Sequence, residues 1–261
     1  MTLKKKKPDP ARWRTAVSAA ALALLLAATV WTVRRPEIVA AVAPARELPV
    51  YCVERADKKI AISFDAAWGN EDTQTLIDIL NAHDVHATFF LVGGWVDKYP
   101  DSVKALADAG NEVMNHSDTH PHLAQLSAEQ VQAEVSTCAD KIEAITGVHP
   151  TLFRCPYGEY NDTVIKSIRA IGIEPIQWDV DSLDWKGISA DEITKRVLDG
   201  VKPGSIVLFH NAAEHTPEAL AGIIEALQAE GYEFVPISEL LLEGDTTIDN
   251  AGCQHPAKSA S

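Results

Sequence analysis

The sequence has little cysteine: four residues in a chain of 261, and no two of them form a C-x-x-C pair. A disulfide scaffold is therefore excluded, because proteins of that kind contain many more cysteines for their length. The chain also lacks a G-x-G-x-x-G or G-K-[ST] motif after its first expected strand at 59–64. Nucleotide binding at that strand thus has no local support.

Basic residues are scarce after residue 49. Only 14 of the 23 Lys and Arg residues lie beyond that point, against 34 of the 37 Asp and Glu residues, so this part carries a net charge of about −20. Such a charge argues against nucleic acid, or an anionic membrane surface, as a partner of the main domain. Hydrophobic residues make up 46% of the chain, which is enough for a large core and excludes disorder throughout.

One long segment without charge lies near the N-terminus. Residues 16–33 contain no charged side chain, and this length is close to the minimum for crossing a bilayer. Six Lys and Arg residues precede the segment and Arg34 and Arg35 follow it, which favours a cytoplasmic N-terminus and an extracytoplasmic domain. The alternative is a cleaved signal peptide with processing at 41–43, which exports the domain as well. We expect an uncleaved signal-anchor, because the two arginines separate the apolar run from that processing site.

The chain is accordingly expected to have five parts. They are a basic cytoplasmic N-terminus at 1–15, the anchor at 16–33, a linker at 34–49, the main domain at 50–244 and a flexible polar tail at 245–261. Export would permit a disulfide, and Cys52 with Cys253, which flank the domain, is the pair expected first. Cys138 and Cys155 are expected to be buried free thiols.

Strands and helices alternate along the main domain. The expected strands are 59–64, 87–92, 111–115, 151–154, 174–178, 205–209 and 233–236. The expected helices are 73–83, 100–109, 127–145, 162–171, 190–198, 217–229 and 238–242. Because most of these strands are apolar on both faces, they predict a parallel sheet covered by helices. From the pattern alone, a closed barrel and an open sheet both remain open.

Five of the seven expected strands, the first and the third to sixth, end in, or are followed by, a polar residue. These residues are Asp65, His116, Arg154, Asp179 and His210. Since the carboxyl ends of parallel strands share one edge of the sheet, we expect these side chains to converge there. A single buried strand that ends in a polar group is ordinary, whereas five of seven indicate a functional site.

Each of these motifs is weak when taken alone. His116 and His120 are four apart, which on a helical turn places both rings on one side, but they could equally be an exposed loop pair. Position 117 is Ser, so this is not the H-E-x-x-H motif of metalloproteases. The acids around Trp185 could form a solvated loop, and His210 alone is typical of a core histidine.

Together the motifs resemble the polysaccharide deacetylase family, the carbohydrate esterases with NodB homology, over 60–242. In order they are Ser63-Phe64-Asp65-Ala66, His116-Ser117-Asp118-Thr119-His120, Arg154-Cys155-Pro156-Tyr157-Gly158, Asp181-Ser182-Leu183-Asp184-Trp185 and Leu208-Phe209-His210. The resemblance implies an α/β fold, a distorted (β/α) barrel of about seven parallel strands. It also implies a divalent metal, zinc above all, with cobalt, nickel or manganese as alternatives.

The resemblance further implies a role for each matching position. Asp65 would be the general base, His210 the general acid, Arg154 the group that holds Asp65, and Asp184 the group that orients His210. His116 and His120 would be metal ligands, Tyr157 would offer a backbone N–H to the oxyanion, and Trp185 and Leu208 would wall the acyl pocket. The metal would polarise the amide and activate water, while acid and base move the protons.

One position departs from the family pattern. The family usually has a second aspartate where this chain has Ala66, so the metal site is expected to be one protein ligand short and to bind more weakly. Asp118 is a candidate substitute. The Phe64-Asp65-Ala66-Ala67-Trp68-Gly69 form also resembles the sporulation-associated branch of the family, which implies a cell-wall glycan as substrate.

We therefore expect a membrane-anchored hydrolase that removes N-acetyl groups from peptidoglycan or a related polysaccharide. The first alternative is a metal-poor homologue that binds glycan with little or no turnover. The second is an amidohydrolase for a small cyclic amide. An open groove would favour a polymer, whereas a capped pocket would favour the small substrate.

Overall fold

The computed structural model describes residues 21–24 and 46–257, and the chain divides into two units, Met1–Arg46 and Glu47–Ser261. In the first unit, residues 21–24 form a helical turn. The rest of the expected anchor at 16–33, and the expected linker up to residue 45, lie outside the described residues. Within the described ranges, no helix combines the length and apolar character needed to cross a membrane.

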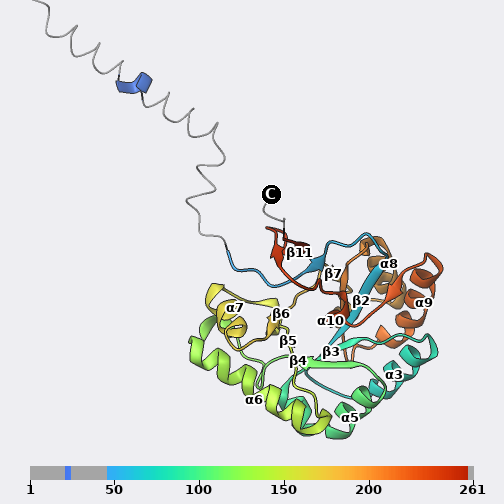
Figure 1. The fold of residues 1–261 in the computed structure, drawn as a ribbon. Coiled ribbons are helices and arrows are strands. Elements are labelled where there is room, and N and C mark those ends of the chain that lie inside the picture. The colour runs from blue at the N-terminus through green and yellow to red at the C-terminus, as the bar shows by residue number, and fades with distance from the viewer. Residues whose placement is uncertain (1–20, 25–45, 258–261) are drawn as a thin grey trace, which may run out of the picture. The chain divides into compact units, whose positions relative to one another are not determined.

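The second unit is built around a parallel sheet (Figure 1). Its strand order is β6-β5-β4-β3-β2-β8-β7, and β9 pairs with the beginning of β2. The strands are β2 (Lys59–Ala66), β3 (Thr88–Leu91), β4 (Glu112–Asn115), β5 (Leu152–Phe153), β6 (Glu174–Pro175), β7 (Val180–Asp181), β8 (Ile206–His210) and β9 (Glu233–Phe234). All their pairings are parallel, which confirms the distorted (β/α) barrel of about seven parallel strands.

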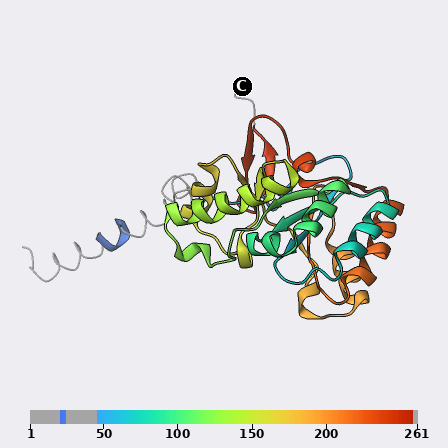
Figure 2. The same cartoon turned by 90° about the horizontal axis from the view of Figure 1, so that it is seen from below.

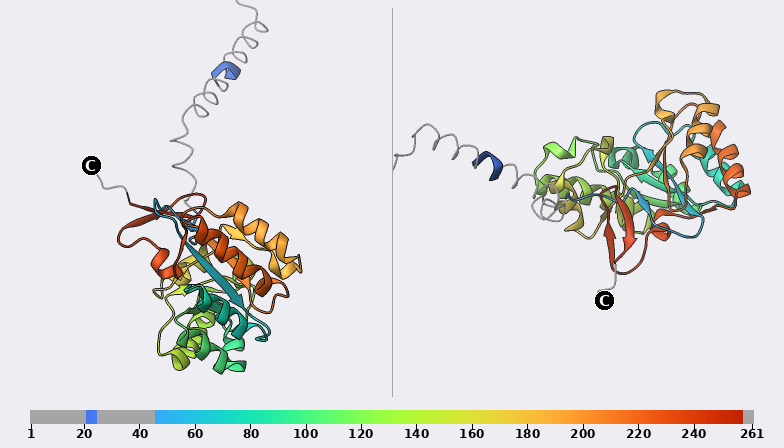
Figure 3. Two further views of the ribbon diagram at one scale, coloured as in Figure 1. Left: turned by 90° about the vertical axis from the view of Figure 1, so that its right-hand side faces the viewer. Right: turned by 90° about the horizontal axis from the view of Figure 1, so that it is seen from above.

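Helices pack outside the strands. They are α3 (Thr73–Ala82), α4 (Gly93–Lys98), α5 (Pro100–Asp108), α6 (Ala128–Thr146), α7 (Asp162–Arg169), α8 (Ala190–Gly200), α9 (Thr216–Ala229) and α10 (Ile237–Leu240). Ser127 caps α6 in a capping box with Gln130, and Gly147 ends it at a φ of 72°, as the sequence predicts. In the left view of Figure 3, the blue-green arrow of β2 runs between the orange helices α8 and α9 and the green helices.

Strand β2 supplies both core and site because its side chains alternate. Ile60, Ile62, Phe64 and Ala66 belong to the largest buried apolar cluster, which includes residues of α3 and α9. The intervening side chains of Ser63 and Asp65 face the other side, where both contact the Arg154 guanidinium. A strand apolar on one face thus carries its polar residues into the barrel.

The expected strand at 174–178 is wrong in its extent. Only Glu174 and Pro175 form β6, and the chain then crosses to the other edge of the sheet, where β7 pairs with β8. Pro175 has no N–H for the ladder, which favours an early end to the strand. Asp179 accordingly accepts hydrogen bonds from Ser205 Oγ and the N–H of Ile206, at the beginning of β8 rather than at its end.

The expected flexible tail is also corrected. Residues Thr246–Ile248 form β10 and Cys253–Pro256 form β11, and together with β1 (Cys52–Val53) they make a three-stranded sheet. Figure 2 shows the red β10–β11 hairpin projecting from one side of the domain. Cys52 and Cys253 are direct partners in the β1–β11 ladder, and both are free thiols in the structure. The pair chosen from the sequence therefore lies side by side.

Candidate active site

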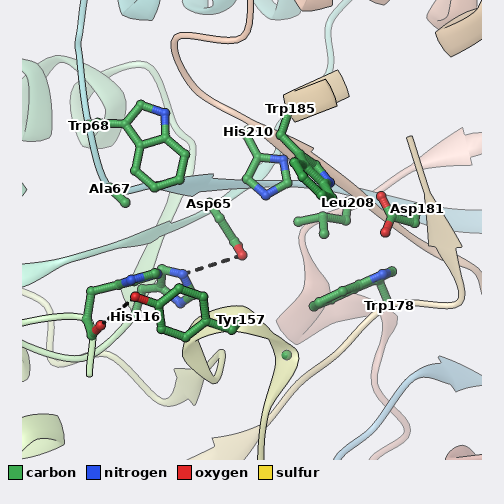
Figure 4. Close-up of a pocket in the computed structure, with 12 residues that line it drawn as sticks. Asp65, Ala67, Trp68, His116, Tyr157, Trp178, Asp181, Trp185, Leu208 and His210 are labelled. Carbon is green, nitrogen blue, oxygen red and sulfur yellow. Dashed lines mark hydrogen bonds and ion pairs between the residues drawn. The ribbon is translucent and has the colours of Figure 1, made fainter. Parts of the chain in front are cut away.

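Neighbouring strands place Asp65 beside His210. The two residues are register partners in the parallel ladder of β2 and β8. Partners in such a ladder lie about 4.8 Å apart, and their side chains leave the sheet on the same face. Figure 4 shows both side chains directed into one cavity, with Asp65 between His210 and His116. The convergence expected from the strand ends is therefore confirmed for these two residues.

Arg154 holds Asp65 in a buried ion pair. Its Nη1 donates to Asp65 Oδ1 at 2.9 Å, and its Nη2 donates to Ser63 Oγ at 2.9 Å and to the carbonyl of Gln177 at 3.1 Å. The guanidinium carbon lies 4.1 Å from the centre of the Phe90 ring, and the arginine is wholly buried. Burial opposes ionisation of Asp65, but the charge and the hydrogen bond of the neighbouring Arg154 outweigh it and lower the pKa of its carboxyl.

His116 presents one ring nitrogen to Asp65. Its Nδ1 lies 2.8 Å from the carbonyl oxygen of Arg154. A carbonyl only accepts, so Nδ1 carries the proton and Nε2 keeps its lone pair. That Nε2 lies 3.5 Å from Asp65 Oδ2, so two electron-pair donors face each other. Burial lowers the pKa of His116, which keeps the imidazole neutral.

His120 lies close to His116, but the two are not on a helical turn. Ser117 and His120 have φ values of 68° and 57°, so the segment is a tight loop after β4. The ring centres are nevertheless 5.0 Å apart. Burial, with His116 beside it, lowers the pKa of His120 to about 4. The expected pairing of the rings is confirmed, and the loop rather than a helix produces it.

Tyr157 covers His120 from the outside. Its ring centre is 4.5 Å from that of His120 and 4.4 Å from that of His122, and its hydroxyl donates to the carbonyl of His120 at 3.3 Å. The backbone of Tyr157 has a φ of 59°, in the left-handed region. A Cβ on the following Gly158 would lie 3.0 Å from the Trp178 ring, so this turn leaves little room for a side chain there.

Asp184 fixes the position of His210. Its Oδ1 accepts from His210 Nδ1 at 2.8 Å, and its Oδ2 accepts from the backbone N–H of His210 at 2.8 Å and from Thr216 Oγ1 at 2.7 Å. Burial alone would lower the pKa of His210, but the carboxylate of Asp184 outweighs it and raises that pKa. The imidazole therefore keeps its proton to a higher pH than an ordinary histidine.

These side chains surround a cavity of about 380 Å³. Its walls include Asp65, His116, His120, Tyr157, Trp185, Leu208 and His210, seven of the nine residues expected at the site. The other two, Arg154 and Asp184, lie behind the wall, where each binds one of these residues. Asp179 is the exception among the five polar strand ends, because its carboxylate binds the opposite end of β8.

The residues present fit a divalent metal only in part. The facing lone pairs of Asp65 and His116 suit a cation, and His120 adds a second imidazole. Yet no group of three His, Cys, Asp or Glu side chains suited to a metal occurs among the described residues. Ala66 is 1% exposed, packs in the outer apolar cluster and is absent from the cavity wall.

Asp118, the candidate substitute ligand, is engaged elsewhere. Its Oδ1 receives a hydrogen bond from Lys141 Nζ at 2.6 Å. A Cβ on Gly93 would lie 2.1 Å from the same oxygen, which shows how closely the carboxylate packs against the start of α4. The expectation that Asp118 replaces the missing ligand is therefore wrong in this structure.

Two residues near the site escape sequence reasoning. Glu134, on α6, accepts from the backbone N–H groups of Asp118 and Thr119 and from the Thr119 hydroxyl, so it holds the loop that carries His120. Trp68 lines the cavity opposite Tyr157 and is 55% exposed (Figure 4). Glu134 gives no sequence signal, since it lies 16 residues from Asp118, whereas Trp68 lies two residues after Ala66, the last residue of the strand-end motif.

Comparison with known proteins agrees with this geometry. The sequence profile of the polysaccharide deacetylase family matches residues 53–176. A peptidoglycan-N-acetylglucosamine deacetylase from Bacillus cereus is 34% identical over 186 residues, which cover 70% of this chain and 68% of that protein. A peptidoglycan-N-acetylglucosamine deacetylase from Listeria monocytogenes is 38% identical over 71% of this chain, but this region is only 39% of the relative's length.

Solved structures share the fold. A pseudoenzyme of carbohydrate esterase family 4 from Bacillus anthracis is 37% identical, with a TM-score of 0.71 over 76% of this chain and 69% of that one. A mutant of the same pseudoenzyme with restored enzymatic activity superposes with a TM-score of 0.72. The shared barrel and the extent of identity lead to one conclusion. This chain belongs to the polysaccharide deacetylase family.

Proposed function

We propose that this protein is a polysaccharide N-deacetylase that hydrolyses N-acetyl groups of a cell-wall glycan. The observation that carries the proposal is the pairing of Asp65 and His210 across β2 and β8, at one cavity. Each has its own fixed partner, Arg154 for the carboxylate and Asp184 for the imidazole. Opposite pKa shifts favour the ionised form of Asp65 and the protonated form of His210, as a base and an acid require.

The reaction follows from these two states. Asp65 takes a proton from the water that attacks the amide carbon, and the backbone N–H of Tyr157 stabilises the resulting oxyanion. His210 donates its proton to the sugar nitrogen as the C–N bond breaks, so acetate and a free amine leave. Trp185 and Leu208 surround the acetyl methyl group. Arg154 and Asp184 contact no substrate and position the base and the acid.

A divalent metal, zinc in the first place, would be held by His116 and His120. When bound, it supplies a Lewis acid for the amide carbonyl and lowers the pKa of a bound water. Two protein ligands are fewer than the three of ordinary catalytic zinc sites, so we propose weak binding. The neutral imidazoles favour binding, and the packing of Ala66 away from the cavity limits it.

We further propose that the domain works outside the cytoplasm, tethered by the apolar segment at 16–33. The six basic residues before that segment support this orientation. Its substrate would be peptidoglycan or a related N-acetylated polymer. The peptidoglycan deacetylases among the relatives support this choice.

A second candidate function is glycan binding with little turnover. The incomplete ligand set favours it, as does the similarity to a family 4 pseudoenzyme. An amidohydrolase for a small cyclic amide is less well supported, because further hollows adjoin the cavity at Trp68.

The decisive experiment measures acetate release from N-acetylated peptidoglycan and chitin oligomers, with and without added zinc, cobalt or nickel. We expect metal-stimulated release by the wild type and a loss of at least about 100-fold in Asp65→Asn, which keeps the shape of the side chain but cannot act as a base. Metal content measured by elemental analysis should be unchanged in that variant. Full turnover by Asp65→Asn would contradict the proposal.

Ala66→Asp separates the two candidate functions. If the wild type is inactive for want of a ligand, and the end of β2 can turn the new carboxylate from the apolar cluster toward the imidazoles, Ala66→Asp should tighten metal binding about tenfold or more and create turnover. Ala66→Asn is the matched control, because it has the same size without the charge. Glycan binding by a wild type that stays inactive with every metal, together with activity in Ala66→Asp, would establish the second function.

A further inference from the structure

Exposed aromatic side chains of the domain gather around the cavity. Trp68, Tyr157 and Trp185 are 55%, 57% and 55% exposed, and all three line it. Within residues 46–257, the one other large hydrophobic side chain with comparable exposure is Val148, which lines none of the hollows at Trp68. Large aromatic surface left in water beside a site marks a place where a ligand covers it.

Trp68 stands where three hollows meet. It lines the main cavity, a hollow of about 230 Å³ on the Trp185 side and a hollow of about 450 Å³ on the α4 side. His120 lies at an edge of the indole, with ring centres 6.4 Å apart, and is shared by the main cavity and the α4 side. A ligand that runs out of the cavity in that direction passes the indole.

The indole is carried by a firmly held backbone. Asn211 Nδ2 donates to the carbonyls of Trp68 and Gly69, both at 2.6 Å, and Trp95 Nε1 donates to the Gly69 carbonyl at 2.6 Å. Asn211 directly follows His210 and is buried. The loop is thus tied to the strand that carries the proposed acid, so the indole keeps a constant position relative to it.

We propose that Trp68 forms a second sugar-binding subsite, in which the indole stacks on the pyranose next to the one whose N-acetyl group enters the cavity. The proposal rests on the proposed function and names its substrate more closely: a glycan strand of at least two, and preferably more, sugars. A flat indole matches the apolar C–H face of a pyranose, and its rigid ring loses little conformational entropy on binding.

The α4-side hollow receives this second sugar. It is the larger of the two neighbouring hollows, and it combines the rings of Trp68 and Tyr99 with polar groups of Lys98 and Thr119. An apolar floor with a few polar groups at the rim is the ordinary composition of a site for a polar ring with many hydroxyls. The ammonium of Lys98 and the hydroxyl of Thr119 can bond sugar oxygens there.

The test compares chain lengths. For the wild type and Trp68→Ala, kcat/KM for acetate release is measured with N-acetylglucosamine, which cannot reach a second subsite, and with chitopentaose. We expect Trp68→Ala to lower the pentamer-to-monomer ratio about tenfold, chiefly through KM for the pentamer. The ratio for Trp68→Phe should lie between those of the wild type and Trp68→Ala, because phenylalanine keeps a smaller flat ring. Val148→Ala, an exposed apolar change outside the three hollows, should leave the ratio as in the wild type.

Binding measurements keep this test independent of catalysis. If the wild type shows no turnover, the dissociation constants of N-acetylglucosamine and chitopentaose are measured by calorimetry, and the same tenfold change in their ratio is expected. An equal loss for both lengths would overturn the proposal, because it would place the indole in the main cavity alone. An unchanged ratio in Trp68→Ala would overturn it as well, provided that thermal melting shows the variant folded.

Discussion

At the scale of single residues, the site places a carboxylate with a lowered pKa beside an imidazole with a raised pKa. Asp65 ionises more easily than usual because the Arg154 guanidinium lies against it, and His210 keeps its proton to a higher pH than usual because Asp184 binds its Nδ1. Activity that needs both states falls at low pH, as Asp65 is protonated below its lowered pKa. It falls again at high pH, as His210 loses its proton above its raised pKa.

Asp184→Asn should shift only the fall of activity at high pH and leave the fall at low pH unchanged. Removal of the negative charge lowers the pKa of His210, so kcat/KM should begin to fall at a pH about one unit lower than in the wild type. The measurement is a pH profile of acetate release. Thr216→Val is the control, since it removes a hydrogen bond to the same carboxylate without changing its charge. An alkaline limb that stays in place in Asp184→Asn would mean that another group titrates there.

At the scale of elements, the loop after β4 depends on helix α6. The loop has two residues with positive φ, Ser117 and His120, and such backbone is costly for side chains other than glycine. Glu134 compensates by accepting two backbone N–H groups and a hydroxyl at distances of 2.8 to 3.0 Å. The helix therefore holds the geometry of the imidazole pair.

Replacing Glu134 should weaken metal binding without touching a ligand. In Glu134→Ala the loop loses three hydrogen bonds, so we expect the zinc dissociation constant to rise about tenfold, on the scale seen when groups that orient metal ligands are removed. Competition with a chromophoric chelator measures it. Glu143 lies on the same helix and forms an exposed ion pair with His149. Glu143→Gln, which removes that ion pair, should bind zinc as the wild type does. Equal affinities in all three proteins would show that the loop holds its shape unaided.

The sequence predicts some of these elements well and misses others for identifiable reasons. Strand β2 follows from its buried apolar run, and α6 from Ser127 and Gly147, because those signals are local. Helix α4 escapes because it begins with Gly93 and Gly94, which disfavour helix. The β10–β11 hairpin escapes because its strands are polar and depend on pairing with β1.

The site shows the same division. Asp65, His116 and His210 could be found, because strand ends in a parallel sheet share an edge, and His120 follows His116 in the same loop. The position of Asp179 at the beginning of β8 could not be predicted, since it depends on the early end of β6 at Pro175. The packing of Ala66 in the largest apolar cluster could not be predicted either, because it depends on the helices outside β2.

At the scale of the whole molecule, β1 and β11 join the beginning and the end of the domain. Cys52 and Cys253 are direct partners there, and paired strands bring Cα atoms into the range that a disulfide requires. Burial raises the pKa of both thiols, which slows their oxidation at neutral pH. The bridge is therefore expected only with an oxidant or a thiol–disulfide exchange catalyst.

Oxidation should stabilise the domain through this bridge. A disulfide typically contributes about 2–4 kcal/mol, so the melting temperature should be several degrees higher in oxidised than in reduced protein. Cys253→Ser should abolish the difference, and Cys155→Ser, a buried thiol elsewhere, should preserve it. Peptide mass spectrometry identifies the linkage. Four free thiols after oxidation would contradict the expectation.

The position of the β1–β11 sheet has a consequence for handling the protein. Val53 bonds the carbonyl of Gly204, beside the beginnings of β2 and β8, whereas Asp65 and His210 lie at the far ends of these strands, about 20 Å away along the chain direction. In the left view of Figure 3, the arrowhead of β2 points away from the red hairpin. A surface, dye or fusion partner attached at either boundary of the domain is thus attached far from the cavity that Asp65 and His210 line.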